Sequence, residues 1–226
     1  MANLTQLRML ENLDGFLLVD KPAGLPFTTV VKTVKRKFNL VKVGHGGSLD
    51  AMASGLLVIL VNGANRFAGD VMGADRAYTG TMKFGAGTDT GDRYGRPVPQ
   101  PERVMSPSEA KGDVFQVEPR FCSVRKEGSA DYEIADTGEH QQFLAHVYRF
   151  DVGEESEDGV SPFSLSASKG VIVRALAQDL GATLMSLRRT RVGKFDVADA
   201  MPFDRLLEIE IGDFASCVKP MSAFLR

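Results

Sequence analysis

The sequence predicts an α+β fold with a mixed, mostly antiparallel central sheet flanked by helices. Three observations lead to this prediction. Several short apolar or alternating segments are typical of strands, two segments have apolar residues at helical spacing, and strands and helices do not alternate as they do in a parallel α/β sheet. The chain has 226 residues, 43% hydrophobic and 25% charged, which predicts one folded domain over 1–226 and excludes a disordered chain.

The first elements are a strand and a helix. Gly15–Asp20 has the pattern of a short buried strand and ends at the turn-forming residues Lys21-Pro-Ala-Gly24. Thr28 or Thr29 is expected to cap the helix that follows. The apolar residues at helical spacing in this helix are Val30, Val31, Val34 and Phe38.

A glycine-rich loop, Gly44–Asp50, separates this helix from an apolar strand that begins at Leu56. Arg76–Phe84 alternates between apolar and polar residues, as a half-buried strand does. The polar segment Thr88–Gly95 predicts a turn, because its two aspartates lack the ligand count of a calcium-binding loop.

Residues from about 105 to 140 are polar and predict an arm inserted between core strands. Strand patterning resumes at Val147–Val152 and at Phe163–Ser168. A helix is expected after these strands. Its apolar face is expected to contain Leu176, Leu180, Leu184 and Leu187.

Composition favours a cytoplasmic protein without a metal site. No apolar run approaches the ~18 residues of a membrane helix, and the N-terminus is too polar for a secretory signal. The two cysteines, Cys122 and Cys217, lie far apart in the sequence and are expected to be free thiols. Together with three dispersed histidines, they lack the spacing of zinc ligands.

Charge is distributed unevenly, although the formal net charge is only −2. Basic residues cluster over 32–42 and again over 188–194, whereas acidic residues gather at Glu154–Asp158. A basic face of this kind can hold a nucleic-acid backbone even on a slightly acidic protein. Taken singly, each cluster is explained more simply as the solvated face of a surface helix.

The most informative candidate site is the loop Gly44-His-Gly-Gly-Ser-Leu-Asp50. Its glycines allow backbone conformations closed to other residues and let a ligand approach closely. Asp50 would stand at the mouth of the core, where a carboxylate suits attack at a sugar or base carbon. A phosphate-binding P-loop is excluded because no Gly-Lys-Ser/Thr follows. From spacing alone, a turn-capping role for Asp50 is the simpler explanation.

Arg174 and Tyr78 are further candidates. Arg174 lies at the start of a predicted helix, from which it could pair with a carboxylate and keep it ionised. Tyr78 could stack on a nucleic-acid base. A surface arginine and an ordinary strand aromatic are the alternatives that the sequence leaves open.

Motifs along nearly the whole chain resemble those of the TruB family of tRNA pseudouridine synthases. Gly15–Gly24 resembles the first motif of the family, and Gly44-His-Gly-Gly-Ser-Leu-Asp-Ala-Met-Ala-Ser-Gly55 resembles its catalytic GHTGTLDPLATG loop. The match continues in order through Ala74–Tyr78, Thr88–Asp92, Gln116–Pro119, Ser168–Gly170, Arg174 and Leu187–Gly193. The resemblance implies the catalytic fold of the pseudouridine synthases.

The resemblance also implies isomerisation of uridine to pseudouridine in RNA, most specifically at uridine-55 of the tRNA T-loop. Asp50 matches the catalytic aspartate that attacks the uridine. Tyr78 matches the tyrosine that stacks on the flipped base and takes the C5 proton, and Arg174 matches the arginine that pairs with the aspartate.

Residues that the resemblance assigns to binding of the substrate or RNA are Lys21, His45, Arg66, Lys169, Leu187 and Arg188. His45 lies near the entering nucleotide, and Leu187 forms an apolar wall against the base. The arm, over about Val114 to Gly138, resembles the family's thumb, which closes on the tRNA T-arm. No metal or organic cofactor is implied, and a monomer that binds tRNA is expected.

The chain departs from the family pattern near these residues. Gly46 and Ala51 replace the usual Thr and Pro around the catalytic aspartate, and Ile172 replaces a tyrosine. Phe27 stands in place of a small polar residue, and Glu118 replaces the first of two prolines in the thumb. We expect a short family member with no C-terminal RNA-binding domain after the core.

Three functions stay open at the level of sequence. An active tRNA pseudouridine synthase is favoured because Asp50, Tyr78 and Arg174 are all present. An RNA chaperone or RNP assembly factor on the same fold is the alternative, motivated by the lost tyrosine at position 172 and by the mild acidity. A glycosidase-like hydrolase would need a second carboxylate, which no feature pairs with Asp50.

Overall fold

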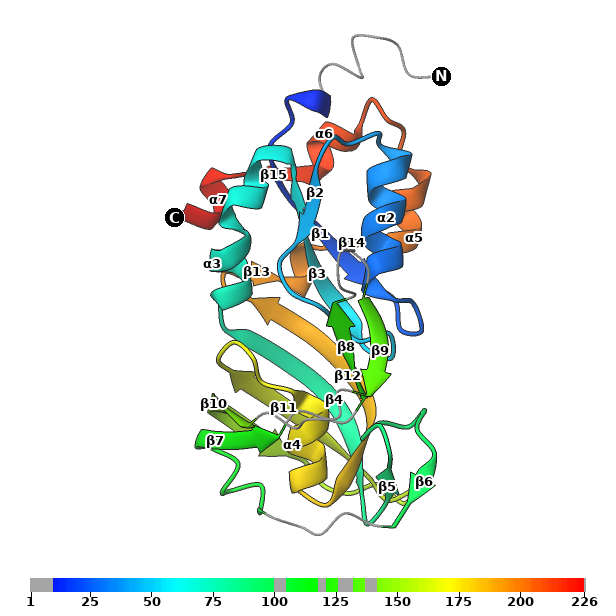
Figure 1. The fold of residues 1–226 in the computed structure, drawn as a ribbon, viewed down its shortest axis with the longest axis vertical. Coiled ribbons are helices and arrows are strands. Elements are labelled where there is room, and N and C mark those ends of the chain that lie inside the picture. The colour runs from blue at the N-terminus through cyan, green and yellow to red at the C-terminus, as the bar shows by residue number, and fades with distance from the viewer. Residues whose placement is uncertain (1–9, 100–104, 118–120, 126–131, 137–141, 226) are drawn as a thin grey trace. The chain divides into compact units, whose positions relative to one another are not determined.

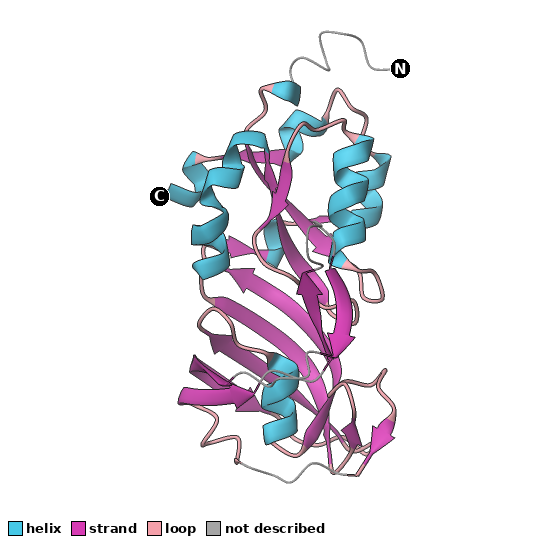
Figure 2. Ribbon diagram, in the orientation of Figure 1, coloured by secondary structure: helices cyan, strands magenta, loops and turns pink. Residues whose placement is uncertain are grey.

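The computed structural model of the protein describes residues 10–99, 105–117, 121–125, 132–136 and 142–225. It contains helices and many strands, and most neighbouring strands are antiparallel (Figures 1 and 2). The predicted α+β fold with a mostly antiparallel sheet is therefore confirmed. The chain divides into two compact units, residues 1–74 with 189–226 (unit 1) and residues 75–188 (unit 2).

Unit 1 is built around the antiparallel pair β1 (Gly15–Lys21) and β3 (Ser54–Val61). Almost every residue of both strands is buried, which explains why Gly15–Val19 and Gly55–Val61 are continuously apolar instead of alternating. Both strands confirm the sequence prediction. Their register ends with Lys21 opposite Gly55, so Lys21 lies beside the loop that leads into β3.

Short strands extend the sheet of unit 1. β14 (Met201–Pro202) pairs in parallel with β1, and β15 (Val218–Pro220) pairs antiparallel with it. β2 (Val43–His45) pairs antiparallel with β3. β13 (Phe195–Asp196) pairs antiparallel with the end of β12 (Ala182–Val192).

Helices supply the remaining core of unit 1. Its helical elements are α2 (Phe27–Lys37), η1 (Asn62–Phe67), α3 (Ala68–Gly73), η2 (Val197–Asp199), α5 (Phe203–Glu208), α6 (Phe214–Cys217) and α7 (Ser222–Leu225). Alternate residues of β1 and β3 form an apolar cluster with Val71 of α3 and with Phe195. Phe38, which follows α2, stacks on Phe214 with ring centroids 3.8 Å apart.

The predicted helix over the residues that follow the first turn is confirmed as α2, but its predicted cap is wrong. Pro26 occupies the N-cap position, and its carbonyl accepts hydrogen bonds from the amides of Thr29 and Val30. The helix begins at Phe27 because the proline ring sets an extended turn before it, and the Phe27 side chain is buried. Three basic residues, Lys35, Arg36 and Lys37, fall in the last turn of α2, where they stabilise the helix dipole.

Unit 2 carries a set of strands in the order β12-β4-β11-β10-β7. β4 (Arg76–Phe84) pairs antiparallel with β11 (Val160–Ala167), and β11 pairs antiparallel with β10 (Gln142–Val152). The three predicted strands in these segments are therefore confirmed. β7 (Gly112–Val117) pairs antiparallel with β10 and completes the set.

The arm predicted over residues 105–140 leaves the sheet later than expected. Its first half contains β7, in which Val114 and Gln116 are buried while Phe115 is 71% exposed. This one-sided burial explains why the segment looked too polar for a core strand. β8 (Phe121–Arg125) and β9 (Tyr132–Asp136) form a separate two-stranded hairpin within the predicted arm.

The turn predicted at Thr88–Gly95 is confirmed. β5 (Gly87–Thr88) and β6 (Pro97–Val98) pair across it. The Asp92 carboxylate accepts hydrogen bonds from the Thr90 hydroxyl at 3.0 Å and from the Tyr94 amide at 2.9 Å. Asp92 thus satisfies donors of the turn itself.

The single helix predicted through Leu187 is wrong. α4 covers only Val173–Asp179, and β12 begins at Ala182. Gly181 adopts a φ of 70°, the left-handed conformation that commonly ends a helix. Leu184 and Leu187 are buried along a strand whose first residues are buried on both faces, so their spacing does not distinguish a strand from a helix.

Substitution of Gly181 by alanine should lower the free energy of unfolding by about 1–2 kcal/mol, because alanine is strained in the left-handed region. Gly73→Ala is the matched control. Gly73 ends α3, and an added Cβ there meets no atom within 4 Å. Urea unfolding of both variants measures the difference, and equal stability of the two would contradict the role of Gly181.

Candidate active site

The loop between β2 and β3 carries Asp50. Its neighbours Leu49 and Ala53 are buried, and the Ala53 amide donates to the Asp50 carbonyl at 3.1 Å. Asp50 itself is half-buried. A carboxylate-bearing residue thus lies on a tight turn at the edge of the apolar core.

Lys21 supports this loop from inside unit 1. Its side chain is fully buried, and its ammonium donates to the carbonyls of Pro22 at 2.9 Å, Leu25 at 2.7 Å and Ala51 at 3.3 Å. The Ala51 carbonyl also accepts from the Gly24 amide at 2.7 Å. In this structure Lys21 binds the protein's own backbone, and its contact with RNA stays a prediction.

Burial lowers the pKa of Lys21 to about 8. The Asp50 carboxylate opposes this shift by favouring the ammonium form, and Arg189 adds to it by charge repulsion. The charges of Lys21, Asp50 and Arg189 therefore interact within unit 1.

Arg189 is a buried residue beside this loop that the sequence analysis names only as part of a motif. It is 1% exposed, and its guanidinium donates through Nε to the Leu56 carbonyl at 2.8 Å. Its two terminal nitrogens donate to the carbonyls of Ser48 at 2.7 Å and Gly47 at 3.3 Å. Leu187 and Arg189 are alternate residues of a strand and are both buried, a pattern that the expectation of a helix over this segment does not predict.

His45 ends β2 next to the glycine-rich loop. Its Nδ1 accepts a hydrogen bond from the Gly47 amide at 3.3 Å, which assigns the ring proton of a neutral His45 to Nε2. The ring packs edge-on against Phe27 with centroids 4.9 Å apart. Phe27, one of the departures from the family pattern, therefore acts as an apolar support for His45.

Gly46 departs from the family pattern for a packing reason. A Cβ at this position would lie 2.3 Å from Cγ1 of Val71 and 3.2 Å from Cβ of Val58. Val71 is fully buried in α3, so it occupies the space that a threonine at position 46 would require. Arg66, the remaining candidate of unit 1, is exposed on η1 with its guanidinium over the Phe67 ring.

Unit 2 contains the other candidates. Tyr78 on β4 and Leu187 on β12 are both buried, with 6% of each residue exposed. Tyr78 lies opposite Leu165 of β11. Arg188 is half-buried beside Leu187.

Arg174 is the second residue of α4 and is 6% exposed, which excludes the alternative of a surface arginine. Its Nη1 donates to the Thr90 carbonyl at 2.8 Å. The turn that follows β5 thus helps to orient the guanidinium.

Gln116 of β7 fixes the chain just before Arg174. It is fully buried, its Nε2 donates to the Ile172 carbonyl at 3.1 Å, and its Oε1 accepts from the Ile172 amide at 3.0 Å. Sequence comparison marked Gln116 only as part of a motif. These two bonds use only the backbone of residue 172, so they are independent of the change from tyrosine to isoleucine.

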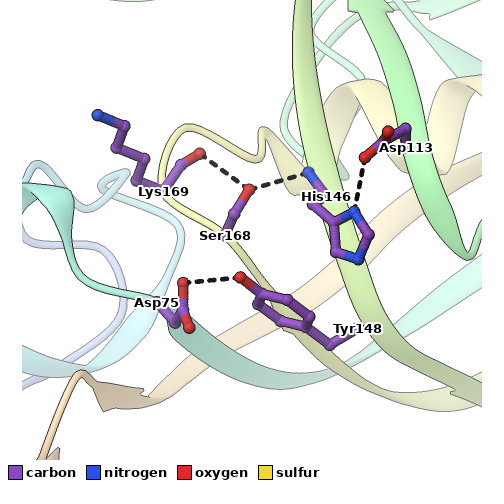
Figure 3. Close-up of polar contacts among 6 residues, drawn as sticks. All are labelled: Asp75, Asp113, His146, Tyr148, Ser168 and Lys169. Carbon is purple, nitrogen blue, oxygen red and sulfur yellow. Dashed lines mark hydrogen bonds and ion pairs between the residues drawn. The ribbon is translucent and has the colours of Figure 1, made fainter.

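Lys169 is exposed on a turn that Ser168 ties to β10. The Ser168 hydroxyl accepts from the His146 amide at 2.9 Å, and the Ser168 amide donates to the His146 carbonyl at 2.8 Å. Figure 3 shows the Lys169 side chain extending away from these contacts. In the same view, Nδ1 of His146 lies 2.6 Å from Asp113, and the Tyr148 hydroxyl donates to Asp75 at 3.2 Å.

Across the described part of the chain, no group of three or more His, Cys, Asp or Glu residues is arranged to hold a metal ion. Cys217 is a free thiol, as predicted, whereas the side chain of Cys122 lies outside the described residues. None of the helices in the described ranges is long and apolar enough to cross a membrane.

Lys21 should make the free energy of unfolding rise with pH between about 8 and 10.5. Its pKa is about 8 in the folded protein and 10.5 without burial, so the unfolded chain binds more protons in this window. Lys21→Met should remove this rise. Urea unfolding near pH 7.5 and near pH 9.5 tests it, with the exposed Lys194→Met as control. An unchanged pH dependence in Lys21→Met would contradict the assignment.

Gly46→Ala should destabilise the protein by about 1–3 kcal/mol through overpacking against Val71. Val71→Ala removes the clashing methyl group, so the double variant should be more stable than the sum of the two single effects predicts. Thermal or urea unfolding of the four proteins measures this coupling. Strictly additive effects would show that Val71 does not determine the residue at position 46.

Comparison with known proteins gives a consistent result. A sequence model of the TruB family pseudouridylate synthase (N terminal domain) matches residues 35–173. The tRNA pseudouridine synthase B of Gluconacetobacter diazotrophicus is 34% identical over 212 residues, covering 86% of this chain and 69% of that protein. The enzyme of the same name from Bordetella avium is 34% identical over 219 residues, covering 87% of this chain and 88% of the relative.

A solved structure supports the fold. The crystal structure of a Cbf5-Nop10-Gar1 complex contains a chain that superposes with a TM-score of 0.67 at 24% identity. The match covers 96% of this chain but only 63% of the solved chain, less than two thirds of its length. From the family model and the curated relatives, the chain belongs to the TruB family of pseudouridine synthases.

Proposed function

We propose that this protein isomerises uridine to pseudouridine in tRNA and that Asp50 is the residue that attacks the uridine. Membership of the TruB family supports the isomerisation of uridine as the reaction. The name of the relatives, tRNA pseudouridine synthase B, supports tRNA as the substrate. The structural observation that supports Asp50 is its place on a loop whose backbone is held by buried Lys21 and Arg189.

The reaction breaks the C1′–N1 glycosidic bond, turns the base and forms a C1′–C5 bond. The proton on C5 leaves, and N1 gains one, so the isomerisation needs no cofactor or second substrate. The detached base must stay bound while it turns, which favours a pocket poor in water. Asp50 at the edge of an apolar core suits such a pocket, because its neighbours Leu49 and Ala53 are buried.

The family resemblance supports roles for the candidates of unit 2. Tyr78 would stack on the flipped base, returning about 1–3 kcal/mol of the few kcal/mol that flipping costs, and would take the C5 proton. Leu187 would form an apolar wall against the base. Arg174 would pair with the catalytic carboxylate, and its burial and its bond to Thr90 are consistent with a fixed guanidinium.

The same resemblance supports uridine-55 in the tRNA T-loop as the target. It also supports the T-arm as the contact of the arm over about Val114 to Gly138, which contains β8 and β9. Exposed basic residues of α2 and of the turn at Lys169 provide charge for the phosphate backbone. His45 and Arg66 would lie against the RNA. A cytoplasmic monomer with a single catalytic domain over 1–226 is proposed on the same grounds.

An RNA chaperone without catalysis is not favoured by the comparisons, because the relatives are named as synthases. The observations in favour of a chaperone are the lost tyrosine at position 172 and the mild acidity. The backbone of that residue is held by Gln116 whatever its side chain, so the segment before Arg174 keeps its anchor.

Asp50→Ala should abolish pseudouridine formation on an unmodified tRNA transcript, with a loss of roughly 10⁴-fold or more, because removal of a nucleophile eliminates the reaction path. Asp70→Asn, at an exposed aspartate of α3, is the matched control and should keep wild-type activity. Pseudouridine is measured by its chemical labelling, nucleotide by nucleotide. Tight tRNA binding by Asp50→Ala would confirm that the loss lies in chemistry.

Two results would count against the proposal. Conversion by Asp50→Ala at the wild-type rate would remove Asp50 from the mechanism. Release of free uracil would indicate a glycosidase instead of an isomerase. A transcript with cytidine in place of uridine-55 tests the target, because any conversion elsewhere in it would widen the substrate range.

A further inference from the structure

We infer that Arg189 is a positioning residue for Asp50, and that its guanidinium fork sets the path of the backbone that presents the carboxylate. The inference rests on the proposed function, because it takes Asp50 as the attacking group. Arg189 is not itself placed against the substrate. It is 1% exposed, and the carbonyls that it binds belong to the Asp50 loop and the adjoining strand.

The geometry gives Arg189 contacts on both sides of Asp50 in the sequence. Its terminal nitrogens bind the carbonyls of Gly47 and Ser48, which precede Asp50. Its Nε binds the carbonyl of Leu56 in β3, which follows Asp50. One rigid side chain therefore ties the entering loop to the departing strand.

The loop needs such an external support because its own sequence is flexible. Gly46 and Gly47 have no side chain to pack, and Gly47 has a φ of 127°, which side-chain-bearing residues rarely adopt. A guanidinium presents donors in a fixed planar fork, so it can fix neighbouring carbonyls at defined angles. A lysine carries the same charge on a flexible stem but lacks this fork.

Close backbone contact fixes Arg189 in turn. Gly55 has a φ of 103°, and a Cβ there would lie 2.3 Å from the Arg189 carbonyl oxygen. The backbone of β12 thus packs directly on the start of β3. Because its backbone is packed this closely, Arg189 has little freedom to shift. Its hydrogen bonds therefore restrict the movement of the Asp50 loop.

Positioning matters for rate more than for binding. A displacement of about 1 Å in a reacting group costs on the order of 100-fold in rate. Apart from His45, which lies beside Gly47, the RNA contacts proposed above come from other segments, so most of the tRNA affinity should not depend on the Arg189 fork. A change at Arg189 is therefore expected to lower kcat and to leave the affinity for tRNA largely unchanged.

The test compares Arg189→Lys, which keeps the charge and loses the fork, with Arg189→Gln, which loses the charge and keeps an amide donor. Arg191→Lys is the matched control, two residues further along the same strand but exposed. Single-turnover rate at saturating tRNA, Kd for tRNA and Tm are measured for each protein. We expect about 100-fold slower conversion in both Arg189 variants, with Kd within about twofold and Tm still well above the assay temperature.

Several outcomes would overturn the inference. Wild-type conversion by Arg189→Lys would show that the fork is not needed. A rate loss that matches the unfolded fraction, or failure of both variants to fold, would assign Arg189 a purely structural role. The proposed function is tested separately, by comparing the wild-type protein with Asp50→Ala. If the wild-type protein is active and Arg189→Lys is equally active, only the role of Arg189 is rejected.

Discussion

The structure of unit 1 depends on backbone carbonyls that converge on two buried cations. Lys21 binds the carbonyls of Pro22, Leu25 and Ala51, and Arg189 binds those of Gly47, Ser48 and Leu56. Burying a charge is costly unless hydrogen bonds compensate for lost water, and here each cation makes at least three. These bonds help to fix a glycine-rich segment that has few side chains of its own to pack. Asp50 therefore lies on a loop whose backbone is held by the buried side chains of Lys21 and Arg189.

Unit 2 uses the same principle for Arg174. The carbonyl of Thr90 accepts from the guanidinium, and Gln116 brackets the amide and carbonyl of Ile172 two residues earlier. Both supports act through backbone groups. The isoleucine at position 172 changes only a side chain, so these backbone hydrogen bonds and the position of Arg174 do not depend on it.

Two departures from the family pattern in unit 1, at Gly46 and Phe27, have local explanations in packing. Gly46 leaves room for Val71, which would collide with any Cβ at that position. Phe27 starts α2 and places its ring against the edge of His45. Each change is matched by a neighbour that fills or requires the altered volume, as close-packed interiors demand. They are consistent with a functional loop and give no reason to assign the chain to another class.

The sequence by itself determined the apolar strands β1 and β3, the turn at Thr88–Gly95 and the motifs that identify the family, because these depend on local pattern and residue type. Only the tertiary structure decided that Leu184 and Leu187 lie on a strand. The first residues of β12 are buried on both faces and show no alternation, so the leucine spacing resembles that of a helix until the pairing partners of the strand are known. The role of Arg189 was also decided only by the tertiary structure, since the sequence shows an arginine but not the distant carbonyls that it binds.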